Sequence, residues 1–262
     1  IINVNGKKIG YLVYVEFLSG DENEFRENLN AIFTEFSVAG ISDLIIDLRY
    51  NPGGNGDEAI HLASAIAPSG VIQDEELLVH LEYNDQLSNL LIEENMQHRF
   101  EYKFTNDVVN VGVNRVFFLT TSETASASEL VISGLDPYME VVQIGDTTAG
   151  KCYGSWVIPD ENEEWTIVPI VLKYSNAEGY TDFTNGLAPD YYMKDNIIEA
   201  RPFGDVTDPM LGKAVELASG MRIETQQEAV LKSTQSFTSI VPYQMELEKR
   251  LVFEGIGGLH AN

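Results

Sequence analysis

The 262-residue sequence has few basic residues, one cysteine and no long apolar run. Lysine and arginine total 16 against 41 acidic residues, which gives a formal net charge of −25 and a pI near 4.3. This balance argues against a nucleic-acid partner, because binding to phosphates requires a basic surface. The simplest consequence of so much negative charge is solubility through mutual repulsion.

Other absences exclude further classes of protein. The single cysteine, Cys152, cannot form an intrachain disulfide, so cysteine usage does not indicate a compartment. Apolar runs such as residues 44–46 are far shorter than the roughly 20 residues that a membrane span needs. The acidic residues lack the spacing of a ligand set, so we expect no metal. No signal peptide is visible, and the strand-like start at Ile1 suggests an excised mature fragment.

The first third of the sequence alternates strand and helix signals. Residues 10–17 (GYLVYVEF) have the composition of a buried strand, and residues 22–38 have the periodicity of an amphipathic helix that Gly40 ends. A second apolar strand from residue 41 leads into a glycine-rich turn and a helix that ends before Pro68. Strand, turn and helix repeated in this way predict an α/β fold with βαβ units and parallel strands.

The rest of the sequence is less uniform. Residues 70–110, rich in Glu, Asn and Gln, are predicted to be an irregular surface insert. Further strands are expected at residues 113–120, 141–145 and 165–173, and further helices at residues 126–135 and 208–219. Residues 221–262 have weak periodicity, and we expect a tail that packs on the core.

The loop GDTTAGKC at residues 145–152 allows three interpretations. G-x-x-x-x-G-K begins a P-loop, in which backbone N–H groups and a lysine hold phosphates. A P-loop requires Ser or Thr after the lysine and then a helix, but Cys152 follows, and YGSWVIPDENEE has the composition of a strand and a turn. We therefore expect no nucleotide. Lys151 is then either a solvated lysine in a turn or a catalytic base.

Ser126, 25 residues before Lys151, lies where a strand turns into a helix. The sequence SASE is typical of a capping box, with Ser126 and Glu129 satisfying free N–H groups at the helix start. The same position suits a nucleophile, because the helix N-terminus offers positive potential and the free N–H of Ala127 for an oxyanion.

A nucleophilic serine needs a base, since its hydroxyl is a weak nucleophile at neutral pH. None of the four histidines, His61, His80, His98 and His260, has an obvious partner segment, so we expect structural or solvated roles for them. Lys151 can serve if burial lowers its pKa from about 10.4 toward roughly 7–8.

A third turn, DLRYNPGG at residues 47–54, also follows a predicted strand. The adjacent Gly53 and Gly54 allow close approach of the backbone to a ligand, and their N–H groups could provide a second oxyanion donor. Alone, NPGG is only a turn. The carboxyl ends of parallel strands meet at one edge of a sheet, where ligands bind, and all three turns are predicted there.

Four motifs in this order, LIIDLRYNPGG, TASASELV, IGDTTAGK and NGLAPD (residues 185–190), resemble the C-terminal processing peptidases, or tail-specific proteases. The resemblance covers roughly residues 8–220. It implies a peptidase core at residues 1–220, with an open sheet flanked by helices and a smaller strand-rich portion.

The resemblance also implies a Ser–Lys dyad without metal or cofactor. By motif position, Ser126 is the nucleophile rather than Ser128, Lys151 is the general base, and Gly53, Gly54 and Ala127 form the oxyanion hole.

Several residues around the dyad are expected to support it. Thr148 and Ser155 are expected in supporting positions, and Glu129 as a cap rather than a catalyst. The family often has a glutamine four residues after the lysine, where this chain has Ser155, whose hydroxyl could substitute through a water molecule. The family usually carries a PDZ domain, which we do not find in this chain; either it has been removed or this member recruits substrates differently.

The implied function is that of a serine endopeptidase that cleaves unfolded or tail-exposed polypeptides through an acyl-enzyme. Its implied location is outside the cytoplasm, in a bacterial periplasm or cell envelope. Activity should fall as the pH drops and Lys151 becomes charged. The alternative is a non-catalytic ligand- or peptide-binding module on the same fold, like the retinoid-binding modules of the interphotoreceptor matrix. The sequence does not indicate an oligomeric state.

Overall fold

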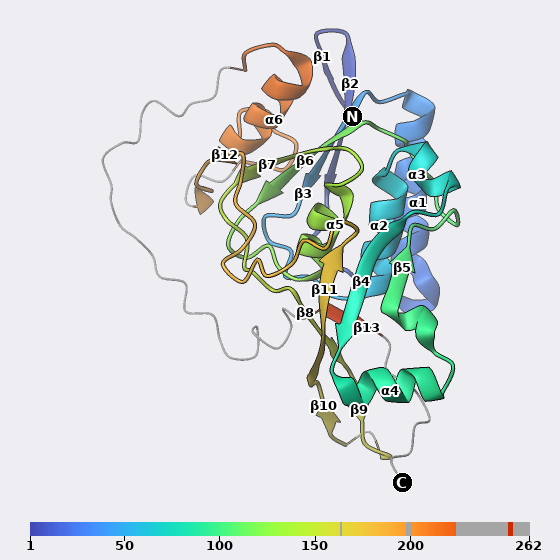
Figure 1. Cartoon of the computed structure of the whole chain (residues 1–262). Coiled ribbons are helices and arrows are strands. Elements are labelled where there is room, and N and C mark those ends of the chain that lie inside the picture. Colours follow the sequence, from blue (N-terminus) through green and yellow to red (C-terminus); the bar gives the residue numbers. More distant parts are fainter. Residues whose placement is uncertain (163, 198–200, 224–250, 254–262) are drawn as a thin grey trace.

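The computed structural model describes residues 1–162, 164–197, 201–223 and 251–253 (Figure 1). These residues form a six-stranded sheet, a five-stranded sheet and a small two-stranded hairpin, with helices packed against the sheets. The prediction of an α/β fold with an open sheet flanked by helices is confirmed.

The six-stranded sheet has the order β1-β2-β3-β6-β7-β12. Its strands are β1 (Ile2–Val4), β2 (Lys7–Val13), β3 (Asp43–Asp47), β6 (Arg115–Thr120), β7 (Glu140–Gly145) and β12 (Tyr191–Tyr192). Neighbours from β2 to β12 are parallel, whereas β1 pairs antiparallel with β2. Every residue of β3 is buried, as expected of a central parallel strand that is covered on both faces.

Helices cover both faces of this sheet (Figure 1). The helices are α1 (Glu24–Ala39), preceded by the 3-10 turn η1 (Asp21–Asn23), α2 (Gly56–Ile66), α5 (Ala127–Leu135) and α6 (Pro209–Ser219). Side chains alternate along β3, so that Leu44 and Ile46 pack with α1, α2 and α5, while Ile45 packs with α6. As predicted, α1 ends at Gly40, whose φ of 66° is a left-handed conformation that glycine adopts without steric cost.

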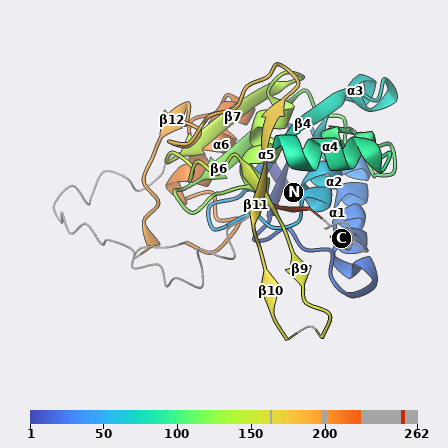
Figure 2. The same ribbon diagram turned by 60° about the horizontal axis from the view of Figure 1, so that its bottom comes forward.

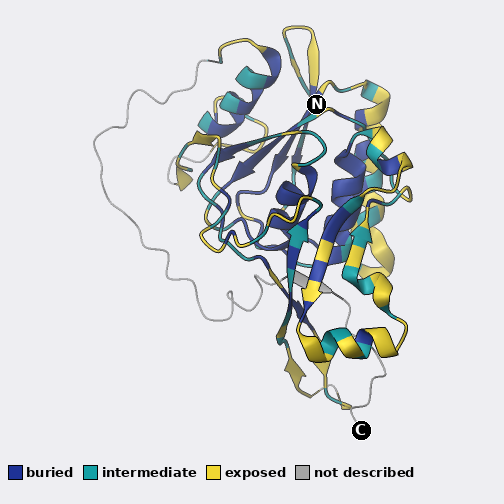
Figure 3. Cartoon of the chain, viewed as in Figure 1, coloured by how far each residue is buried: buried dark blue, intermediate teal, exposed yellow. Residues whose placement is uncertain are grey.

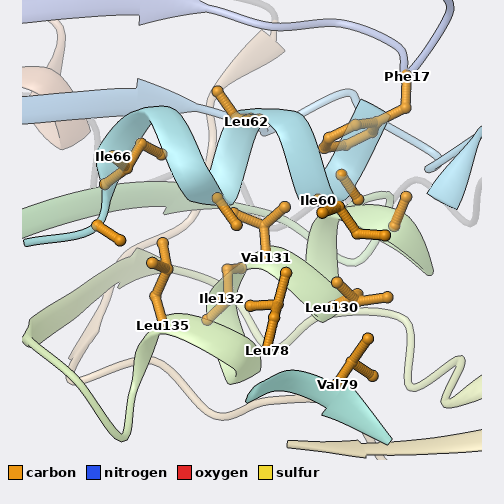
Figure 4. Close-up of a cluster of buried hydrophobic side chains, with 14 of the residues drawn as sticks. Phe17, Ile60, Leu62, Ile66, Leu78, Val79, Leu130, Val131, Ile132 and Leu135 are labelled. Atoms are coloured by element: carbon orange, nitrogen blue, oxygen red, sulfur yellow. The ribbon is translucent and has the colours of Figure 1, made fainter. Parts of the chain in front are cut away.

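The five-stranded sheet has the order β13-β8-β11-β4-β5. Its strands are β13 (Leu251–Phe253), β8 (Tyr153–Trp156), β11 (Ile170–Asn176), β4 (Leu77–Tyr83) and β5 (Glu101–Lys103). This sheet packs against α5, which in turn packs on α2. In Figure 4, Val131 of α5 lies between the two helices, and Leu78 and Val79 of β4 lie against the other side of α5.

The prediction of an irregular insert at residues 70–110 is wrong. This region contains α3 (Ser69–Gln73), β4, α4 (Asp85–Glu93), the 3-10 turn η2 (Gln97–Phe100) and β5. The strand β4 alternates between buried and exposed residues (Figure 3), and its Leu78, Val79 and Leu81 belong to the main core. Its principal partner, β11, comes nearly 90 residues later, so the polar local composition concealed a strand that long-range pairing stabilises.

Beyond β8 the chain forms a hairpin of β9 (Ile158–Pro159) and β10 (Thr166–Ile167) that projects from the body of the molecule (Figure 2). The predicted strand and turn after Lys151 are therefore confirmed. No helix within the described ranges is long and apolar enough to cross a membrane. Most of the predicted tail, residues 224–250 and 254–262, lies outside the described residues.

Candidate active site

Three loops meet at the carboxyl edge of the six-stranded sheet. They follow β3, β6 and β7, which are adjacent and in register, with Asp47 beside Leu119 and Leu119 beside Ile144. Backbone hydrogen bonds join the loops: Ala125 N–H donates to Asn51 O at 3.1 Å, and Ala149 N–H donates to the carbonyl of Thr124 at 2.9 Å. The three loops at the edge that the sequence predicts for the site are therefore joined to one another by hydrogen bonds.

Ser126 lies at the start of α5 in a strained backbone conformation. Its φ of 62° and ψ of −111° are rare for a residue other than glycine, and such strain tends to occur at functional sites. The residue has no exposed surface, and its Oγ has no hydrogen-bond partner among the described residues. Of the capping box that the sequence predicts, the Glu129 half is formed, whereas the Ser126 hydroxyl makes no capping hydrogen bond. This hydroxyl therefore makes no hydrogen bond with Lys151.

The buried Glu129 carboxylate joins the serine turn to the lysine loop. Its Oε2 accepts from the N–H groups of Ser126, at 2.7 Å, and Lys151, at 2.8 Å. Its Oε1 accepts from the Thr148 hydroxyl, at 2.5 Å, and the Gly150 N–H, at 2.7 Å. Because Ser126 and Lys151 donate to the same oxygen atom, Glu129 fixes the positions of their backbones relative to each other.

Tyr174 of β11 makes a second link between the same two residues. Its hydroxyl donates to the carbonyl oxygens of Ser126, at 3.1 Å, and Lys151, at 3.2 Å. Burial of the ring, with the Glu129 carboxylate nearby, raises the pKa of Tyr174 well above its ordinary value. The phenol therefore remains a neutral donor across the working pH range.

The glycine loop lies directly against Ser126. Gly53 and Gly54 have φ of 107° and 134°, and a Cβ at Gly53 would lie 2.7 Å from the Cβ of Ser126 and 3.0 Å from the nitrogen of Ala127. Gly53 N–H donates to Asn51 Oδ1 at 2.8 Å, so this donor is already engaged. Ala127 is the first residue of α5, where an N–H has no acceptor within the helix.

A buried ion-pair network holds the base of the glycine loop. The Arg49 guanidinium donates to Asp47 at 2.7 Å, to Asp208 at 3.0 Å and to Asp195 at 3.2 Å. Asp208 also accepts from two N–H groups at the start of α6, so the network ties that helix to the end of β3. Breaking such a buried pair is strongly destabilising, because it leaves an uncompensated charge.

The segment that follows Lys151 is inconsistent with a phosphate loop. It continues into β8 rather than into the helix that a P-loop requires after its lysine. Cys152 is buried, and burial raises the pKa of its thiol, which keeps it neutral and poorly nucleophilic. Ser155 is buried in β8, and Thr148 both donates to Glu129 and accepts from the N–H of Leu187 at 2.7 Å.

The histidines within the described residues have other environments. His61 in α2 bonds Asn30 of α1 at 3.0 Å, and its burial lowers its pKa. His80 in β4 lies 3.9 Å from Glu101, and His98 is in η2. His260 lies outside the described residues.

Sequence reasoning missed two supporting residues. Tyr174 is one of 12 tyrosines, and the alternation of its strand indicates only that it faces inward. Asn51, which holds the Gly53 N–H, could have been recognised from its position two residues before a glycine, since Asn in turns often accepts from that N–H.

Comparison with known proteins finds matches in one family of peptidases. The model of peptidase family S41 matches residues 8–193. A carboxy-terminal-processing protease of Bartonella bacilliformis is 25% identical over 76% of this chain and 42% of its own length. The carboxy-terminal processing protease CtpA of Bacillus subtilis is 27% identical over 67% of this chain and 33% of its own length. The chain thus spans less than half of either relative.

Solved structures show the same fold. The crystal structure of a Bacteroides fragilis protein assigned to the S41 proteases superposes with a TM-score of 0.73 at 30% identity, over 84% of this chain and 56% of that one. The photosystem II D1 C-terminal processing protease gives a TM-score of 0.53 at 21% identity, over 71% of this chain and 42% of that one, which shows the fold alone. Because the family model matches most of this chain, the chain belongs to peptidase family S41.

Proposed function

We propose that this chain is a serine endopeptidase in which Ser126 is the nucleophile and Lys151 the general base. One observation supports it above others: the N–H groups of Ser126 and Lys151 converge on a single oxygen of Glu129. The carboxylate holds the nucleophile turn and the base loop in fixed register at the edge of the sheet. Glu129 is a positioning residue in this mechanism.

The first step is activation of the serine. Neutral Lys151 takes the proton of the Ser126 hydroxyl as the oxygen attacks a peptide carbonyl. In this structure the hydroxyl is unbonded, and hydrogen bonds of catalytic groups often form fully only with substrate in place. Rotation of the Ser126 side chain, with the backbone held by Glu129, brings the hydroxyl to the base.

The second step is stabilisation of the tetrahedral oxyanion. The proposed donors are the Ala127 N–H at the start of α5 and the backbone of the Gly53–Gly54 loop, where Gly54 provides the N–H because that of Gly53 is bound to Asn51. Protonated Lys151 then gives its proton to the leaving amine. Water attacks the acyl-enzyme with Lys151 again as base, which releases the acid product and restores the serine.

The substrate class is unfolded or tail-exposed polypeptide. The names of the relatives, carboxy-terminal-processing proteases, support cleavage near a chain end. A site built from backbone donors does not require particular side chains in the substrate. Because the chain is related to these proteases, we also propose a location outside the cytoplasm, in a bacterial periplasm or cell envelope.

Mass spectrometry of an unfolded polypeptide incubated with the chain tests the proposal. The parent should cleave, and Ser126→Ala and Lys151→Ala should not. Ser128→Ala is the matched control, because this neighbouring serine only bonds the Asn51 carbonyl, at 3.3 Å, and it should retain cleavage. Cleavage that survives at Ser126→Ala and is lost at Ser128→Ala would refute the assignment. Binding of polypeptide by all four proteins without any cleavage would instead support the non-catalytic binding module.

A further inference from the structure

The strand β8 pairs with one strand on each side, and these two strands come from different parts of the sequence. On one side it pairs antiparallel with β11, which follows it in the sequence. On the other side it pairs in parallel with β13, with Gly154 beside Leu251, Ser155 beside Val252 and Trp156 beside Phe253. Without this three-residue segment, β8 would be the edge of the five-stranded sheet, with backbone groups open to pairing.

This edge lies beside the candidate active site. The strand β8 begins two residues after Lys151, and because the pairing is parallel, the N-terminal end of β13 is the end closer to Lys151. The segment also contacts α2, the helix that follows the Gly53–Gly54 loop. It therefore lies between the strand that leaves the lysine and the helix that leaves the glycine loop. Ser126 is fully buried in this arrangement.

We propose that the edge of β8 that β13 covers is the acceptor for an extended polypeptide substrate, and that β13 occupies it as an internal competitor. The proposal rests on the proposed function for the identity of the substrate. Pairing of backbone N–H and C=O groups is largely independent of side chains, which suits a binding site for unfolded polypeptide. A segment of the same chain that already pairs there shows that the edge accepts a strand.

The competition is reversible because β13 is short. A substrate strand longer than three residues pairs along all of β8 and continues toward the projecting β9, whose Ile158 is exposed. Such a strand makes more backbone hydrogen bonds than β13 and displaces it. Occupation by β13 keeps the edge covered when no polypeptide is present, which also protects it from pairing with other chains.

Proline substitutions in β13 test the competition. Proline has no N–H, and alternate residues of a strand bond a given neighbour, so Val252→Pro and Phe253→Pro between them remove an N–H that faces β8. Val252→Thr is the matched control, because it keeps the N–H and a β-branched side chain. Amide hydrogen exchange at residues 154–156 should rise in at least one proline variant and stay at the parent level in the control.

The proline variant with faster exchange should cleave an unfolded polypeptide with a KM several-fold lower than the parent and an unchanged kcat. A synthetic peptide of residues 247–258 should inhibit that variant competitively, and the same peptide with proline in place of Val252 and Phe253 should not. An unchanged KM in a variant whose β8 amides have become exposed would overturn the proposal, as would inhibition by both peptides alike.

A binding measurement separates this inference from the peptidase assignment. In a Ser126→Ala background, a fluorescently labelled unfolded peptide should bind more tightly when Val252→Pro or Phe253→Pro is also present. Tighter binding combined with no cleavage by any form of the chain would support the strand acceptor and refute the peptidase. Cleavage combined with unchanged binding would support the peptidase and refute the strand acceptor.

Discussion

Replacement of Glu129 by glutamine tests the link between the Ser126 turn and the Lys151 loop, which we propose to be catalytic. The substitution keeps the size of the side chain but leaves one acceptor oxygen in place of two. Oε1 and Oε2 each accept two hydrogen bonds in the parent. Whichever way the amide is oriented, its NH₂ group faces two donors, so two of the four hydrogen bonds are lost and two buried donors lose their acceptor.

The size of the effect follows from the type of bond. A hydrogen bond to a charged group contributes about 1.5–3 kcal/mol, so the loss of two lowers the free energy of unfolding by about 3–6 kcal/mol. This is a large part of the 5–15 kcal/mol typical of a domain. In one of the two orientations of the amide, the NH₂ group replaces the oxygen that accepts from both Ser126 and Lys151. Activity should therefore fall even at temperatures where the variant remains folded.

Urea unfolding and steady-state kinetics at low temperature measure the two effects separately. Glu140→Gln is the matched control, since Glu140 is largely exposed and lies 3.8 Å from Arg115, a surface pair that contributes little. We expect Glu129→Gln to lower kcat more than it changes KM, while the control matches the parent. If Glu129→Gln unfolded within about 0.5 kcal/mol of the parent and kept its kcat, Glu129 would not position the loops.

Three further predictions concern other parts of the fold. Gly53→Ala places a Cβ 2.7 Å from the Cβ of Ser126 at a φ of 107°, so kcat should fall by about 100-fold or more, as when an oxyanion donor is lost; a kcat near the parent value would place the oxyanion elsewhere. Tyr174→Phe removes the donor to the Ser126 and Lys151 carbonyls and should cost about 1–2 kcal/mol in urea unfolding; full stability and activity would show that the hydroxyl is dispensable. Burial lowers the pKa of His61 in the folded chain, so below the unfolded-state pKa of about 6.5 the unfolded chain binds a proton that the folded chain does not, and stability is lost as the pH falls. Between pH 7.5 and 5.5, the urea midpoint of His61→Gln should therefore fall less than that of the parent. An equal fall of the midpoint in both proteins would contradict the burial argument.

Local sequence patterns were sufficient to predict the central sheet. The parallel strands β2, β3 and β6 are each a short apolar run followed by a turn and a periodic helix, and the helix ends are marked by residues such as Gly40 and Pro68. The five-stranded sheet was not predictable in the same way. It is assembled from β4 and β11, which lie far apart in sequence, and from β13, so its pairing depends on contacts that no local window contains.

The sequence predicted which loops form the candidate site but not the hydrogen bonds that join them. The motifs around Gly53, Ser126 and Lys151 predicted three turns at one edge, and the structure joins all three. The pattern SASE predicted a cap, and the structure uses Glu129 for that and also for the lysine loop. The positive φ of Ser126 could not be inferred, because a residue other than glycine adopts it only when its surroundings impose it.

The links between the Ser126 turn and the Lys151 loop have one property in common: they bind backbone groups. Glu129 accepts from the N–H groups of Ser126 and Lys151, and Tyr174 donates to the carbonyl oxygens of the same two residues. The backbone N–H and C=O groups of both residues are thereby hydrogen-bonded, while the Ser126 hydroxyl stays unbonded. A serine side chain held in this way, as proposed for the nucleophile, can change rotamer without any movement of its loop. In the proposed mechanism the Ser126 hydroxyl reaches Lys151 by rotation of the side chain, so the backbone that carries the proposed oxyanion donors does not have to reorganise during the reaction.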